Sequence, residues 1–165
     1  MGYSIAGFII NGPLLERKHE LNSIFEFQLK DSFQVSLESA LESKYETNIV
    51  DIYDSANCSI LICSCDCLEE CSKLGQLTLN GQKLVEFILS DVSEVFAFRF
   101  YECGIKTSED FYVMEPEFTC YGANKLQLVE SDDVIEVGLS RVVFPLTGKK
   151  FMELDRKKMV HRFNV

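Results

Sequence analysis

Apolar residues alternate with other residues at several places in this chain, and this two-residue period constrains the fold most. Phe96, Phe98 and Phe100 are each separated by one residue of another kind. Successive side chains of a strand point to opposite faces of the sheet, so the pattern predicts a strand with one buried face. The same period over residues 25–29 predicts another strand.

Two further segments favour strands. Apolar residues flank Ser131-Asp132-Asp133, which predicts a hairpin over residues 125–139 with a short acidic turn. Residues 142–146 are predicted to add a strand. Because Pro145 cannot donate a ladder hydrogen bond, that strand is expected at an edge of the sheet.

Other segments follow the helical period. Apolar residues recur every four positions from Phe33 to Tyr45, which predicts a helix. Another helix is expected to begin after Pro13, and a basic helix is expected after Thr147. Residues 77–92 fit two structures, because Asn80-Gly81 is typical of a hairpin turn while the apolar residues that follow also suit a helix.

The length and composition indicate one folded unit. A chain of 165 residues with 47% hydrophobic residues is large enough to bury a core without disulfides or metals. We therefore expect a single compact α+β domain over residues 1–165. Its sheet is expected to be mainly antiparallel, with two to four helices that include the basic C-terminal helix.

The charge is negative and unevenly distributed. The formal net charge is −10, yet residues 141–165 hold seven Lys or Arg residues and only two acidic residues. A negative body repels phosphate backbones and attracts a basic partner, so we expect no nucleic acid among its ligands. The basic segment is expected to dock on the acidic body; the alternative is an external anionic ligand, such as a membrane surface or nucleic acid.

Acidic residues gather in two parts of the sequence, with aromatic residues interleaved in the second. Carboxylates steer a cationic partner while aromatic side chains supply contact area. The alternative is that these carboxylates only keep the protein soluble. The candidate residues for binding a basic protein are Glu38, Glu42, Glu46, Glu69, Glu70, Glu109, Asp110, Glu115 and Glu117.

Five of the seven cysteines lie between Cys58 and Cys71. If residues 60–66 form a strand, Cys63, Cys65 and Cys67 share one face about 6.6 Å apart, too far to bind one zinc ion together. We therefore expect core packing and no metal or other cofactor. The alternatives are a metal site at Cys63, Cys65, Cys67 and Cys71 and a redox thiol, although neighbouring acidic residues would oppose a reactive thiolate.

Catalytic motifs are absent from the sequence, including the G-x-S-x-G elbow, the phosphate-binding loop and the H-E-x-x-H zinc helix. We accordingly expect a binding protein and not an enzyme; a small enzyme without a recognisable motif is the alternative. No signal-peptide pattern or membrane span is visible, which predicts a cytoplasmic protein. The sequence does not determine the oligomeric state.

These observations favour a non-catalytic domain that binds a basic protein. The sharpest form of this hypothesis is a neutraliser of the immunity type, which occludes the basic active site of a bacterial toxin such as a nuclease.

Overall fold

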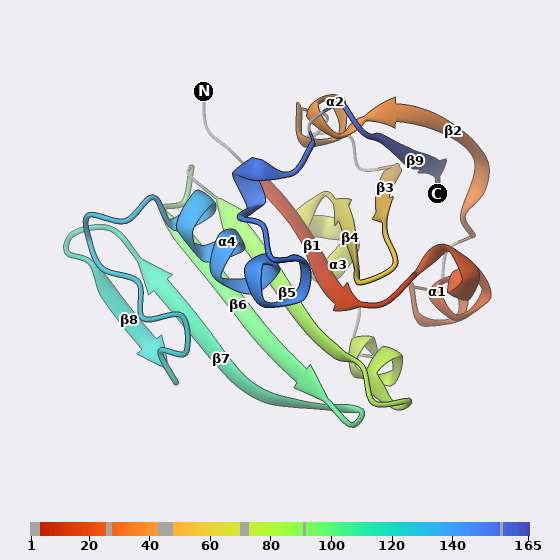
Figure 1. Cartoon of the computed structure of the whole chain (residues 1–165). Coiled ribbons are helices and arrows are strands. Elements are labelled where there is room, and N and C mark those ends of the chain that lie inside the picture. The colour runs from red at the N-terminus through yellow and green to blue at the C-terminus, as the bar shows by residue number, and fades with distance from the viewer. Residues whose placement is uncertain (1–3, 26–27, 43–47, 70–72, 91, 156) are drawn as a thin grey trace.

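The computed structural model describes residues 4–25, 28–42, 48–69, 73–90, 92–155 and 157–165. Within these residues one antiparallel sheet of nine strands has the order β2-β9-β3-β4-β1-β5-β6-β7-β8 (Figure 1). The strands are β1 (Ser4–Asn11), β2 (Lys30–Ser36), β3 (Ile49–Asp54), β4 (Cys58–Cys63), β5 (Lys83–Ser90), β6 (Val95–Glu102), β7 (Ile105–Val113), β8 (Thr119–Gly122) and β9 (Met159–Asn164). The helices are α1 (Lys18–Phe25), α2 (Leu37–Glu42), α3 (Cys65–Glu69) and α4 (Val134–Thr147), with 3₁₀ turns η1 (Leu15–Arg17), η2 (Leu74–Thr78) and η3 (Phe151–Glu153). This confirms the expected α+β class with a mainly antiparallel sheet.

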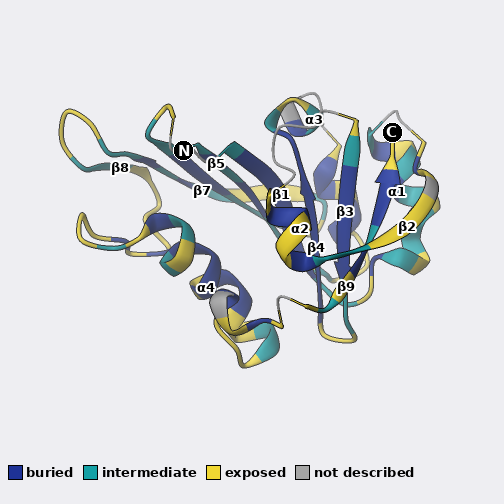
Figure 2. Ribbon diagram, turned by 90° about the horizontal axis from the view of Figure 1, so that it is seen from above, coloured by how far each residue is buried: buried dark blue, intermediate teal, exposed yellow. Residues whose placement is uncertain are grey.

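Helices cover both faces of the sheet, so the molecule has two hydrophobic cores. Side chains of α2, α4 and η3 pack on one face, which we call the α4 face. Side chains of α1, α3 and η2 pack on the other, the α1 face. Figure 2 shows α4 and α3 on opposite sides of the strands.

The central strand β1 is buried on both faces. Phe8 and Ile10 pack in the core of the α1 face, while Ile5 and Ile9 pack in the core of the α4 face. Double burial explains why residues 5–10 form a continuous apolar run instead of alternating. Gly7 is required here, because a Cβ atom at this position would lie 2.0 Å from the carbonyl oxygen of Leu61 on the neighbouring strand.

The strand predicted from the alternating phenylalanines is confirmed. It is β6, in which Phe96 and Phe98 are buried in the core of the α4 face. The expected helix after Pro13 is also present, beginning as η1 at Leu15 and continuing as α1.

The predicted hairpin over 125–139 and the edge strand over 142–146 are wrong, because residues 134–147 form α4. Asp133 caps this helix by accepting a hydrogen bond from the backbone N–H of Glu136 at 2.9 Å. Leu139, Val142 and Val143 recur at helical spacing and are buried. Pro145 lies in the last turn of the helix, which ends at the left-handed cap Gly148.

The predicted basic C-terminal helix is also wrong. Only the short turn η3 forms, and the chain then enters the sheet as β9 between β2 and β3. The Arg162 guanidinium pairs with the Asp51 carboxylate through two contacts of 2.8 Å, and Lys158 donates to the carbonyl oxygen of Asp54. The basic segment thus docks on the acidic body, as expected, but it does so as a strand.

Three other local predictions need correction. The strand expected over 25–29 is absent from its described residues: Phe25 ends α1, β2 begins at Lys30, and residues 26–27 lie outside the described residues. The helix expected from Phe33 is confined to α2, since residues 30–36 form β2; Tyr45 lies outside the described residues. Asn80-Gly81 does form a turn, but η2 precedes it where a strand was expected, and β5 follows it.

None of the helices in the described ranges is long and apolar enough to cross a membrane.

Candidate functional site

The acidic candidates lie on elements from opposite edges of the sheet. Glu38 and Glu42 are exposed on α2, which contacts β2 and β9. Glu115 and Glu117 are exposed between β7 and β8, at the other edge (Figure 1). Strands are spaced by roughly 4.8 Å, so the eight spacings of the nine-stranded sheet separate its edges by roughly 38 Å, several Debye lengths at physiological salt. The two groups therefore cannot act as one patch.

The remaining sequence candidates differ in how the structure places them. Glu46 and Glu70 lie outside the described residues, and Glu69 ends α3 with a side chain that is not described. Glu109 is half-buried in an ion-pair network on β5–β7. Asp110 is 0% exposed, so its carboxylate is not available to a partner.

Asp110 instead organises the loop that follows β8. Its carboxylate accepts hydrogen bonds from the backbone N–H groups of Lys125 at 2.8 Å and Leu126 at 2.7 Å. The hydroxyl of Tyr112 donates to the same carboxylate and is 3.1 Å from Asn124 Oδ1. Phe118 stacks on the Tyr112 ring, with 5.8 Å between the ring centroids. These contacts attach the β7–β8 connection and the 123–128 loop to one core.

The acid-rich segment from β7 to α4 therefore forms one end of the molecule. Residues 109–136 contain eight acidic residues and a single base, Lys125. Five of the eight carboxylates are exposed, and within the described part of the chain none of the five forms an ion pair. We call this group the acidic end; it consists of Glu115, Glu117, Glu130, Asp133 and Glu136.

Exposed apolar side chains accompany the acidic end. Tyr121 is 58% exposed on the edge strand β8, and Val129 is 54% exposed in the loop before α4. Tyr121 lies beside Phe111 of β7, with 6.3 Å between the ring centroids. Large apolar groups beside unpaired charges are typical of surfaces that bind proteins.

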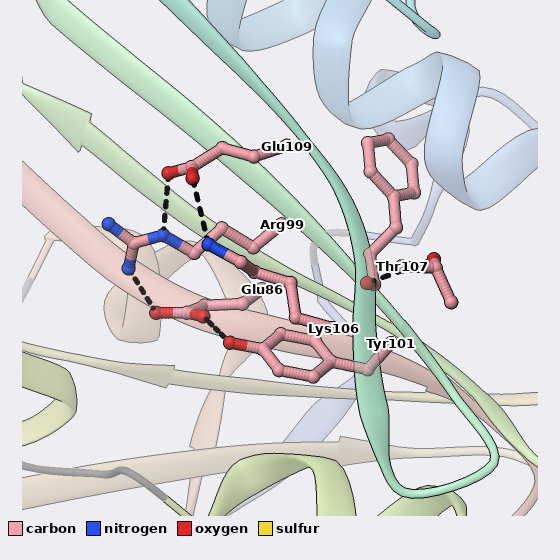
Figure 3. Close-up of polar contacts among 7 residues, drawn as sticks. Glu86, Arg99, Tyr101, Lys106, Thr107 and Glu109 are labelled. Atoms are coloured by element: carbon pink, nitrogen blue, oxygen red, sulfur yellow. Dashed lines mark hydrogen bonds and ion pairs between the residues drawn. The ribbon is translucent and has the colours of Figure 1, made fainter. Parts of the chain in front are cut away.

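A charged network occupies the α1 face of β5–β7 (Figure 3). The Arg99 guanidinium bridges Glu86 at 2.9 Å and Glu109 at 2.8 Å, and Lys106 contacts the other oxygen of Glu109 at 3.0 Å. The Tyr101 hydroxyl donates to Glu86 at 2.7 Å. Burial acts to raise the pKa of Glu109, but the hydrogen bonds from Arg99 and Lys106 outweigh it and lower that pKa. The charges in this network balance one another.

A shallow cavity of about 420 Å³ lies along the outer side of α4. Its lining residues are Glu136, Val137, Ser140, Arg141, Phe144, Pro145 and Lys150. Arg141 and Lys150 bring positive charge to the rim, and Arg141 already donates to the carbonyl oxygens of Leu126 and Gln127. Because Glu136 of the acidic end also lines the cavity, the cavity adjoins the acidic end and its rim has mixed charge.

The cysteine segment does not form the predicted strand over residues 60–66. The strand β4 ends at Cys63, Ser64 lies between the elements, and α3 begins at Cys65. At this break the backbone N–H of Cys67 donates to the carbonyl oxygen of Ser64 at 3.2 Å. Cys71 lies outside the described residues, and among those described no group of three or more Cys, His, Asp or Glu side chains could hold a metal ion.

The environment of Cys67 favours its thiolate. The hydrogen bond from Cys63 lowers the pKa of Cys67 to about 6, against the opposing effect of burial. The Ser64 hydroxyl also donates to its sulfur, at 3.4 Å. By contrast, burial raises the pKa of Cys58 to about 12. Asp66 opposes the thiolate, as expected, but its effect on the pKa of Cys67 is the smallest of those that act there.

Two features of these sites were not predicted from the sequence: three carboxylates of the acidic end and the surroundings of Cys67. Glu130, Asp133 and Glu136 were not candidates because residues 125–139 were assigned to a hairpin, although the D-x-x-E spacing of Asp133 and Glu136 is a helix-capping signal. The hydrogen bond from the Ser64 hydroxyl to the Cys67 sulfur depends on the turn at Ser64, which a continuous strand would not form.

Comparison with protein-family models, with curated proteins and with solved structures finds no match to this chain.

Proposed function

We propose that this chain is a protein-binding domain that docks a basic partner protein on its acidic end. The observation that carries the proposal is the group of five exposed carboxylates with no cation paired to them in the described part of the chain. In this proposal the chain binds its partner and does not turn over a substrate.

The physical basis is electrostatic steering. Unpaired carboxylates on one end create a negative potential that accelerates encounter with a positive surface, most strongly at low salt. Tyr121 and Val129 supply the apolar contact that charges alone do not provide. The same potential opposes the binding of nucleic acid.

The sharpest form of the proposal is a neutraliser of the immunity type. Active sites that bind phosphate backbones are basic, so a small acidic domain can cover such a site on a nuclease toxin.

The cysteines that the structure describes are free thiols, which supports a reducing compartment such as the cytoplasm.

The acidic end is favoured over α2 because of what surrounds each. On α2 the structure describes two exposed candidate carboxylates, Glu38 and Glu42, whereas the acidic end has five. The α2 pair therefore serves as an internal control.

The test compares two charge-reversal variants of the full chain. The first changes Glu115, Glu117, Glu130 and Glu136 to lysine and leaves Asp133 in place because it caps α4. The control changes Glu38 and Glu42 to lysine. Both variants are compared with the wild type for capture of a partner from reduced lysate of the native host.

The expected result is selective loss of binding. The wild type and the α2 variant should retain the same basic protein and release it with salt, and the acidic-end variant should lose it. With the purified partner, stopped-flow association at low salt should slow by about 10- to 1,000-fold in the acidic-end variant. Equal capture by all three proteins, or absence of any partner, would contradict the proposal.

A further inference from the structure

The cavity along the outer side of α4 combines apolar walls with positive charge. Val137, Phe144 and Pro145 line it from the helix, and the Phe144 side chain is 53% exposed. Lys150, which follows α4 in the chain, lies on the rim together with Arg141. The volume of about 420 Å³ falls in the range of about 300–1,000 Å³ that is typical of small-molecule sites.

Ser140 contributes a buried hydroxyl group to the lining of this cavity. The residue is 8% exposed, and its oxygen accepts a hydrogen bond from the backbone N–H of Phe151 at 3.0 Å. In the part of the chain that the structure describes, the hydroxyl proton of Ser140 has no acceptor. Because a buried donor without an acceptor is unfavourable, this hydroxyl favours a ligand that brings an acceptor into the cavity.

The two cations on the rim also keep donors for a ligand. Arg141 Nη1 donates to the carbonyl oxygens of Leu126 and Gln127, and Nη2 lies 3.5 Å from Asp132 Oδ2. These contacts fix the guanidinium and leave two of its five N–H groups without an acceptor among the described residues. Over the same residues the Lys150 ammonium forms no ion pair.

We propose that this cavity binds an aromatic monocarboxylate, whose carboxylate lies among Arg141, Lys150 and the Ser140 hydroxyl while its ring covers Phe144 and Pro145. This inference does not depend on the proposed binding of a basic protein.

The chemistry of the lining selects this class of ligand. A flat ring suits a shallow cavity and can stack on the exposed Phe144 ring. A carboxylate accepts charge-assisted hydrogen bonds from Arg141 and Lys150, which are about twice as strong as bonds between neutral groups. Glu136 lines the same cavity and offsets part of the positive charge, so a ligand with one negative charge fits better than a phosphate dianion.

The first experiment titrates the full chain, labelled with nitrogen-15, with 2-naphthoate and follows the backbone amide resonances by NMR. The largest shifts should fall within residues 136–151, with a Kd of about 1 mM for a ligand of this size. The neutral analogue 2-naphthamide has the same shape and should bind at least about tenfold more weakly. Absence of shifts in this segment, or equal binding of the two compounds, would overturn the proposal.

The second experiment changes the lining. Lys150→Gln removes a cation of the rim and should raise the Kd for 2-naphthoate about 3- to 10-fold. Lys149→Gln is the matched control, because Lys149 is also exposed but does not line the cavity, and it should keep the wild-type Kd. Phe144→Ala removes the aromatic wall and should raise the Kd about 2- to 10-fold. Equal effects of Lys150→Gln and Lys149→Gln, or wild-type affinity in Phe144→Ala, would contradict the assigned contacts.

The same spectra test whether a second copy of the chain fills the cavity instead. Without ligand, the α4 resonances should be identical at low and high protein concentration. Shifts of these resonances that grow with protein concentration would identify self-association through α4 and would overturn the proposed ligand.

Discussion

The buried carboxylate of Asp110 should contribute strongly to stability, and Asp110→Ala tests this. The substitution removes the acceptor of two backbone N–H groups and of the Tyr112 hydroxyl. Each hydrogen bond to a charged group contributes about 1.5–3 kcal/mol, and a buried donor left unpaired costs about 1–3 kcal/mol. The Lys125 N–H can turn to water because Lys125 is exposed, whereas Leu126 is 6% exposed and its N–H cannot. We therefore expect a loss of about 3–5 kcal/mol in the free energy of unfolding.

The assay is urea denaturation followed by circular dichroism, with Asp132→Ala as the matched control. Asp132 also accepts a backbone N–H, that of Val129 at 3.0 Å, but this bond is exposed. Its loss should cost less than about 1 kcal/mol. The dependence of stability on urea concentration should not change if the denatured states are alike. Equal destabilisation by the two substitutions would refute the role assigned to Asp110.

Three other substitutions test a buried ion pair, a close approach of two strands and a helix cap by the same denaturation assay. Arg162→Met leaves the buried Asp51 carboxylate without its cation and should lower the free energy of unfolding by about 3–5 kcal/mol. Adding Asp51→Leu should recover most of that loss. A double variant that is no more stable than Arg162→Met alone would contradict this. Gly7→Ala forces a Cβ atom against the Leu61 carbonyl and should cost about 3 kcal/mol, so wild-type stability would disprove the close approach. Asp133→Ala removes the cap of α4 and should cost about 1 kcal/mol, with Asp133→Asn close to the wild type.

The sequence was most informative where one local pattern had a single structural solution. The phenylalanines of β6 alternate over a full strand, and both the strand and its buried face were predicted correctly. Residues 135–139 also alternate, yet they are helical, because Leu139 continues with Val142 and Val143 at helical spacing and these three side chains are buried together. The capping signal at Asp133 distinguishes the two structures.

Partners far away in the sequence explain why the predicted basic C-terminal helix is wrong. The charges around 149–162 fit an amphipathic helix when only local spacing is considered. Arg162, however, pairs with Asp51, which is 111 residues away in the sequence, and the segment completes the sheet between β2 and β3. Strand pairing of this range overrides local helical preference and is not visible in any window of sequence.

Some candidate site residues were predicted correctly and others were not, because the surroundings of the latter depend on contacts that the sequence does not show. Glu115 and Glu117 are exposed as expected of contact residues, since they follow a strand whose end the sequence marks with Pro116. Asp110 was chosen by charge alone, and only the fold shows that its carboxylate faces the loop N–H groups. For Cys67, the assumption of a continuous strand missed the turn at Ser64, whose hydroxyl donates to the Cys67 sulfur.

The two halves of the sheet differ in how they are covered, and this difference supports the proposed binding at the acidic end. Around β1 both faces carry helices, whereas α4 lies on one side of β5–β7 and the charged network lies on the other (Figures 2 and 3). In that network Arg99 and Lys106 offset Glu86 and Glu109. A face whose charges are paired internally offers little attraction to a partner, because new ion pairs would have to replace existing ones. The carboxylates of the acidic end lack such partners within the described residues, so a basic protein gains more electrostatic energy there than on the face of the sheet.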